Sequence, residues 1–184
     1  MAEIKSTLDL VLEKTKHLTL SEEEKQIQRH DEFRKTLKGL IRKFADKALK
    51  MKELKKELEI LQETYELKEK TILIREILKK IDLDRDNTVL LELLQELYSI
   101  KASNIRSLLK DYRDTRRSTA EKRIHGIKED LSKRHFISGS AIVPNLEADS
   151  EWQAAVRDIR HQFKPLLSRE KAERIERLGY AEAS

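Results

Sequence analysis

Apolar residues recur every three or four positions along most of this chain, and that spacing places them on one face of an α-helix. The longest series follows the stretch Ser21-Glu22-Glu23-Glu24, in which a serine and a glutamate three residues later match the capping box of a helix N-terminus. Its members are Phe33, Leu37, Leu40, Phe44, Ala48, Met51, Leu54, Leu58, Leu61 and Tyr65. Their mean spacing of about 3.6 residues predicts one long helix over 22–65, whose single apolar stripe needs a partner along its length.

Shorter apolar blocks predict that the rest of the chain is also helical. Residues 89–97 are so rich in leucine that we expect this helix to be enclosed on more than one side. A further helix is predicted over 103–135, but its apolar face lapses where Arg116 and Arg123 occupy core-side positions. A second capping-box pattern at 118–121 leaves two interpretations open, a break at that point or a continuous helix with a polar middle.

The segment 136–149 interrupts the helical pattern with glycine, proline and a short β-branched run. We predict a connector with a short extended segment near 141–144, because residues before Pro144 disfavour the α conformation. Two interpretations stand. Either the connector tucks against the helices, or it is an edge strand that pairs with another chain.

A third capping box at 150–153 predicts a helix that stops before Pro165, and a last short helix is expected over 169–178. The whole pattern predicts an all-α fold, one elongated helical domain over 1–184. Its parts are an N-terminal amphipathic helix (1–20), a long-helix bundle (21–135), an extended connector (136–149) and C-terminal helices (150–184). We expect long antiparallel coiled-coil-like helices, with the helix over 103–135 packed against the first long helix.

The composition fits this architecture and excludes several kinds of chemistry. Charged residues make up 40% and aromatic residues 5% of the chain, which suits amphipathic helices with narrow apolar stripes. The absence of cysteine excludes disulfides, thiolate metal sites and a cysteine nucleophile. No apolar run approaches the roughly 20 residues of a membrane span, and no signal-like segment follows Met1. We therefore predict a soluble, cytoplasmic protein without a membrane partner.

The net charge of +5 is concentrated in one segment. Residues 101–135 contain 11 Lys/Arg and 5 Asp/Glu, so this part of the chain carries the basic character of the whole. On a helix, four of these side chains fall within an arc of about 60°, where they could follow a phosphate backbone or face an acidic partner. The row consists of Arg106, Lys110, Arg113 and Arg117. A solvated face, or one that packs against acidic helices, is the alternative interpretation.

The stretch 82–92 resembles the beginning of a calcium-binding loop. It places aspartates at the first, third and fifth positions, but the twelfth position, which should be a bidentate glutamate, is Leu93. Glu92 comes one step early, and the other interpretation is an Asp/Asn turn that caps the following helix. The histidines have no metal-ligand spacing, and neither a glycine-rich phosphate loop nor a G-x-S-x-G motif is present. We predict no cofactor, no metal and no enzymatic activity.

These features predict a non-catalytic intracellular interaction or scaffold protein that forms homo-oligomers or binds a helical partner. The predicted contacts between copies come from the long apolar stripe and from the connector. They are Leu37, Phe44, Met51, Leu58, Ile142 and Val143. The alternative function is nucleic-acid binding through the basic helix face in 101–135.

Two stretches near the N-terminus, MAEIKSTLDL at 1–10 and LTLSEEE at 18–24, are similar to a family of bacterial helical proteins of unknown function. The resemblance covers only these residues. It implies a bacterial origin and carries over no functional residue.

Overall fold

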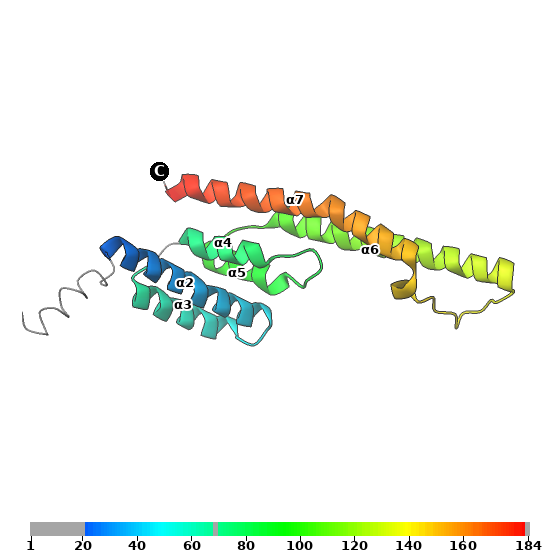
Figure 1. The fold of residues 1–184 in the computed structure, drawn as a ribbon, viewed down its shortest axis with the longest axis horizontal. Helices are drawn as coiled ribbons and strands as arrows, with labels where there is room; N and C mark the ends of the chain where they lie inside the picture. The colour runs from blue at the N-terminus through cyan, green and yellow to red at the C-terminus, as the bar shows by residue number, and fades with distance from the viewer. Residues whose placement is uncertain (1–20, 68–69, 183–184) are drawn as a thin grey trace, which may run out of the picture. The chain divides into compact units, whose positions relative to one another are not determined.

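The computed structural model of the protein describes residues 21–67 and 70–182, which form α-helices joined by loops and by a longer connector over 136–149 (Figure 1). In chain order the elements are α2 (Glu22–Ala45), α3 (Met51–Tyr65), α4 (Lys70–Lys80), α5 (Thr88–Tyr98), α6 (Ser103–His135), the 3₁₀ turn η1 (Leu146–Ala148) and α7 (Ser150–Glu182). No strand occurs among the described residues, and the predicted all-α class is confirmed. The amphipathic helix predicted over 1–20 lies outside these residues.

The chain groups into two compact units, a first that ends at Ile72 and a second that begins at Leu73. Helices α2 and α3 belong to the first unit, and α5, α6 and α7 belong to the second. The boundary falls within the first turn of α4. The single domain expected over 1–184 stays a prediction.

Helix α2 begins at the capping box that the sequence predicts. The Ser21 side chain accepts a hydrogen bond from the Glu24 N–H at 3.2 Å, and the Ser21 N–H donates to the Glu24 carboxylate at 2.7 Å. Three glutamates in the first turn also lie at the positive end of the helix dipole. The buried face of α2 consists of Phe33, Leu37, Ile41 and Phe44.

The single helix predicted over 22–65 is wrong, because α2 ends at Ala45 and α3 begins at Met51. Lys47 adopts a left-handed conformation with φ at 59°, and the Ala48 N–H bonds to the carbonyl of Lys43 at 2.8 Å. This is a Schellman-type helix stop made without glycine.

The apolar stripe survives the turn, since α2 and α3 pack against each other as a hairpin (Figure 1). The buried side chains of α3 are Leu54, Leu58 and Leu61. The rings of Phe33 and Tyr65 meet edge to face, with centroids 6.1 Å apart. The partner that a long apolar stripe needs is therefore supplied within the same unit of the chain.

In the second unit, the segment from α4 to α5 carries a dense group of buried apolar side chains. Those at and just after α4 are Leu73, Ile74, Ile77, Leu78, Ile81 and Leu83. Those of α5 are Leu90, Leu91, Leu93 and Leu94. The α5 leucines cover a broad arc of the helix, which confirms that it is enclosed on more than one side.

Helix α6 runs without a break through its polar middle, which decides between the two interpretations of the sequence. Its core-side arginines are paired instead of interrupting the helix. Arg116 reaches Asp84 at 3.4 Å, and Arg123 reaches Asp149 at 2.6 Å. Helix α7 runs back along α6 and contacts it (Figure 1). The polar middle of α6 is thus a set of ion pairs to other elements of the second unit.

The connector 136–149 contains η1, and no residue in it forms a strand. Phe136 ends α6 in a left-handed conformation with φ at 55°. The segment expected to be extended near 141–144 is a turn followed by residues outside any helix. The prediction that the connector packs against the helices is wrong for two residues, since Phe136 is 90% and Val143 is 87% exposed. Pairing with a strand of another chain stays a prediction.

Helix α7 continues through Pro165, so the stop predicted before this residue is wrong. The proline is exposed, while Ile159 and Leu167 on either side of it are buried. Packing before and after the proline holds α7 together across a residue that cannot donate a backbone hydrogen bond. The separate helix expected over 169–178 is part of α7.

Changing Pro165 to alanine should stabilise the protein by about 2 kcal/mol in the free energy of unfolding. The proline leaves the carbonyl of His161 without its helical donor, and its ring crowds the preceding turn, so alanine removes both costs. Urea and thermal unfolding measure the difference. Lys164→Ala, at the neighbouring exposed position, is the control and should change stability by less than about 0.5 kcal/mol. A less stable Pro165→Ala protein would contradict the prediction.

Candidate functional site

The loop between α4 and α5 is organised by one buried amide, the side chain of Asn87. Its oxygen accepts from the Asp82 N–H at 3.0 Å, and its NH₂ group donates to the carbonyls of Asp82 at 2.6 Å and Arg85 at 2.9 Å. Asn87 is only 6% exposed, so its hydrogen bonds replace those that water would make. The loop therefore holds a fixed shape beside α5.

The carboxylates of this loop accept hydrogen bonds from different backbone N–H groups. Asp82 accepts from the Asp84 N–H at 3.1 Å, and Asp86 accepts from the Thr88 N–H at 3.0 Å, at the start of α5. Within residues 21–67 and 70–182, no group of three or more His, Cys, Asp or Glu side chains is arranged to hold a metal ion. These contacts support the Asp/Asn turn and helix-capping interpretation of 82–92.

Asp84 joins this loop to the two long helices of the second unit. Its carboxylate accepts from the Tyr112 hydroxyl at 2.5 Å and pairs with Arg160 of α7 at 2.8 Å, in addition to Arg116. Burial, and next the hydrogen bond to Asp84, raise the pKa of Tyr112. The Tyr112 ring also meets Phe163 of α7 edge to face at 5.5 Å. The α4–α5 loop, α6 and α7 are therefore held together at this carboxylate.

A second group of ion pairs and hydrogen bonds holds the start of α7. Arg123 binds both carboxylate oxygens of Asp149, at 2.9 and 2.6 Å, and also pairs with Glu151 at 2.5 Å. Asp149 accepts a further bond from the Trp152 N–H at 2.7 Å. The hydrogen bond from Arg123, followed by that from Trp152, lowers the pKa of Asp149. This arrangement fixes the first turn of α7, which carries Trp152.

The surface of the second unit is hollowed in two adjoining places, which we call the basic groove. The first hollow, of about 250 Å³, is lined by Leu83, Arg85, Asn87, Thr88, Leu91, Arg106, Leu109, Lys110 and Arg113. The second, of about 530 Å³, is lined by Leu83, Asp84, Arg85, Asp86, Tyr112, Arg113, Arg116, Arg117, Ala120 and Trp152. Because Leu83, Arg85 and Arg113 line both hollows, the two form one continuous surface.

The first hollow concentrates positive charge. Four basic side chains and no carboxylate line it, and it lies at the N-terminal end of α5, where the helix dipole is also positive. Among the described residues, Arg85, Lys110 and Arg113 form no ion pair. Arg106 donates only to the neutral side chain of Gln95, at 3.3 Å. An anion would therefore meet cations that the protein has not already neutralised.

The second hollow is less strongly charged. Four arginines line it, but Asp84 and Asp86 lie among them, and Arg117 pairs with Asp114 at 3.0 Å. Trp152, the chain's single tryptophan, contributes a partly exposed aromatic ring. This hollow can therefore offer both positive charge and a flat apolar surface.

The row predicted from helical spacing does lie along this groove. Arg106, Lys110 and Arg113 line the first hollow, and Arg117 lines the second. All four are exposed. Their use as phosphate or acidic-partner contacts stays a prediction.

Sequence reasoning missed three further residues of the groove, Arg85, Arg116 and Trp152. Arg116 is three positions after Arg113 on the same helix, which is a local signal. Arg85 and Trp152 come from other elements, and only the folded second unit brings them to α6.

Three of the six residues predicted to join copies of the chain are buried within it. Leu37, Phe44 and Leu58 are between 0% and 6% exposed within the first unit. A second copy could reach them only if the hairpin opened. Met51 and Ile142 are partly exposed, and Val143 is the one strongly exposed member of the set. Contact between copies stays a prediction.

No protein-family model, curated protein or solved structure matches the chain. The similarity of its N-terminus to bacterial proteins of unknown function stays a prediction. Among the helices that the structure describes, none combines the length and apolar character needed to cross a membrane.

Proposed function

We propose that this protein is a non-catalytic nucleic-acid-binding protein and that the basic groove is its interface. The observation that carries the proposal is the first hollow, where Arg85, Arg106, Lys110 and Arg113 meet without a carboxylate. Concentrated cations without partners favour a ligand that brings several negative charges. A cytoplasmic location belongs to the same proposal.

The spacing of the row supports a ligand with repeated charges over a single small anion. At 1.5 Å per residue, Arg106 and Arg117 are about 16 Å apart along α6. A nucleic-acid strand carries one phosphate per 3.4 Å of B-form duplex axis, so a row of this length can meet several phosphates at once. The exposed arginines also present forked donors that match phosphate oxygens.

Binding should weaken steeply with salt. If about four phosphates are neutralised, the affinity for a single strand should fall about 50-fold between about 50 and 200 mM monovalent salt. Fluorescence anisotropy with labelled single- and double-stranded DNA and RNA at these two concentrations measures the effect. Absence of binding to every probe at low salt would rule out the proposal.

A homo-oligomeric scaffold is the second candidate, and one observation favours it. Phe136 and Ile137, just after the end of α6, are 90% and 49% exposed, and Val143 in the middle of the connector is 87% exposed. Large apolar side chains exposed to this degree are candidates for a protein–protein contact. Under this proposal the chain is an elongated bundle with antiparallel coiled-coil-like helices. Failure of all nucleic-acid probes, together with a solution mass above that of one chain, would favour it.

A further inference from the structure

We infer that the basic groove selects single-stranded over double-stranded nucleic acid. The inference rests on the proposed function and adds to it the class of strand. It is carried by the apolar surfaces that lie among the cations of the groove. Positive charge alone would attract any nucleic acid, so the apolar surfaces decide the class.

The first apolar surface is the floor of the first hollow, which consists of Leu83, Leu91 and Leu109. These leucines are buried or nearly so, while the basic side chains around them are exposed. A group that enters this hollow therefore meets apolar atoms below and cations at the rim. A nucleotide unit has that character, because its base has apolar faces and its phosphate is charged.

The second surface is the ring of Trp152 in the second hollow, beside Arg113, Arg116 and Arg117. Proteins that bind single strands commonly combine a basic track with aromatic rings on which bases stack. Trp152 is suited to this because it is partly exposed and its backbone is held by Asp149. Tyr112 is not suited, since it is 1% exposed and its hydroxyl is engaged by Asp84.

A duplex cannot use these surfaces well. Its bases are stacked and paired inside, and it presents mainly phosphate and sugar to a flat or shallow site. The first hollow, at about 250 Å³, is much too small to admit a double helix. A duplex would touch only the rim cations, whereas a flexible single strand can also turn its bases inward.

The test uses the chain's single tryptophan as its reporter. Oligonucleotides of about 12 nucleotides, thymidine-only DNA and uridine-only RNA, are titrated into the protein while tryptophan fluorescence and anisotropy are recorded. A mixed-sequence duplex of equal length and inorganic polyphosphate are the comparison ligands. Single strands should bind at least about tenfold tighter than the duplex and quench Trp152 fluorescence. Polyphosphate, which has no bases, should cause no such quenching.

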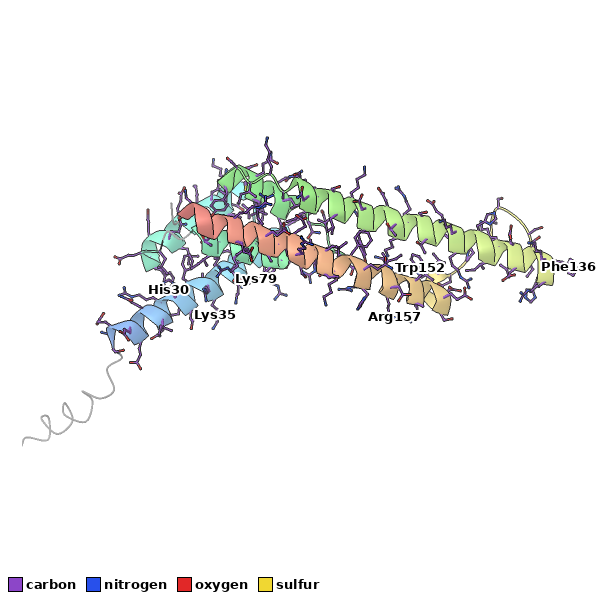
Figure 2. The ribbon with its side chains drawn as sticks, turned by 90° about the horizontal axis from the view of Figure 1, so that it is seen from above. His30, Lys35, Lys79, Phe136, Trp152 and Arg157 are labelled. Carbon is purple, nitrogen blue, oxygen red and sulfur yellow. The ribbon has the colours of Figure 1, made fainter. Side chains whose placement is uncertain are left out.

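Variants separate stacking from charge. Trp152→Leu should lose about tenfold in affinity for the single strands and leave duplex and polyphosphate binding unchanged. Phe136→Leu is the matched control, because Phe136 is an exposed aromatic at the far end of α6 from the groove (Figure 2). It should bind every ligand as the unaltered protein does. If Trp152→Leu did not fold, quenching of Trp152 fluorescence by single strands in the unaltered protein would still test whether bases stack on this ring.

The two proposals fail in different ways. Equal or tighter binding of the duplex, with Trp152 fluorescence unchanged by single strands, would overturn the inference and leave the proposed function standing. No binding of any nucleic acid at low salt would remove both. Preference for DNA over RNA, or the reverse, among single strands would support the inference and refine it.

Discussion

Reversing the charge of the four basic side chains of the first hollow should reduce the affinity for single-stranded nucleic acid by at least about 100-fold at 0.1 M salt. The variant carries glutamate at Arg85, Arg106, Lys110 and Arg113. Each phosphate contact that releases a counterion contributes about fivefold to the affinity at this salt concentration, so four contacts contribute several hundredfold. Glutamate also repels phosphate, which adds to the loss.

The control must show that position matters and not net charge alone. A second variant carries glutamate at four exposed basic residues of the same unit that do not line the groove. They are Lys133, Arg134, Arg157 and Lys164. Its net charge changes by the same amount, yet it should lose no more than about tenfold, through the weaker long-range field. Equal losses in both variants would contradict a localised interface.

A glutamine version of the groove variant guards against misfolding. It removes the four charges without placing new carboxylates beside Asp84 and Asp86, which already lie in this region. Because the groove cations have few partners, their neutralisation should relieve repulsion and leave the melting temperature equal or slightly higher. Lost binding with retained stability would assign the effect to the interface. Unchanged binding in a folded glutamine variant would contradict it.

The sequence predicts that helices are present, but it does not predict where several of them end. The usual signals for ends are glycine and proline, and here both mislead. Gly39 and Gly126 lie inside α2 and α6, and Pro165 lies inside α7. The residues that adopt left-handed conformations at helix ends are Lys47, Glu66, Ser99 and Phe136. All four are exposed, and at each of these ends the amide of the next residue donates to a carbonyl in the last turn of the helix. These local backbone bonds close the helix around a residue other than glycine, in a conformation that residue type gives no signal for.

The candidate site was accessible to sequence reasoning only where it is local. The row from Arg106 to Arg117 follows from helical spacing alone, because all its members lie on α6. The partners of Arg116 and Arg123 are 32 and 26 residues away, and no periodic pattern connects them. Arginines on the core side of α6 therefore suggest an interrupted helix when the sequence is considered alone. Only the folded structure places their partners Asp84 and Asp149 beside them.

Replacing Asn87 with glycine should destabilise the protein by about 3 kcal/mol. A calcium-loop interpretation of 82–92 would allow this change, since glycine is the usual residue at that position. Asn87 has φ at −98°, which any residue adopts, so glycine gains nothing there. It would lose three hydrogen bonds worth about 1 kcal/mol each and add backbone entropy to the unfolded chain.

Urea unfolding with and without calcium distinguishes the two interpretations of this loop. Asn104→Gly is the matched control, because Asn104 is exposed in the first turn of α6 and should cost at most about 1 kcal/mol. Calcium should leave the stability of the unaltered protein and of both variants unchanged, since Asp82, Asp84 and Asp86 already serve separate partners. An Asn87→Gly protein as stable as the control would contradict the role of the Asn87 hydrogen bonds, and stabilisation of either protein by calcium would favour the cation-binding interpretation. The expected loss would instead identify Asn87 as the residue that holds Arg85 at the edge of the basic groove, and binding to nucleic acid should then weaken along with stability.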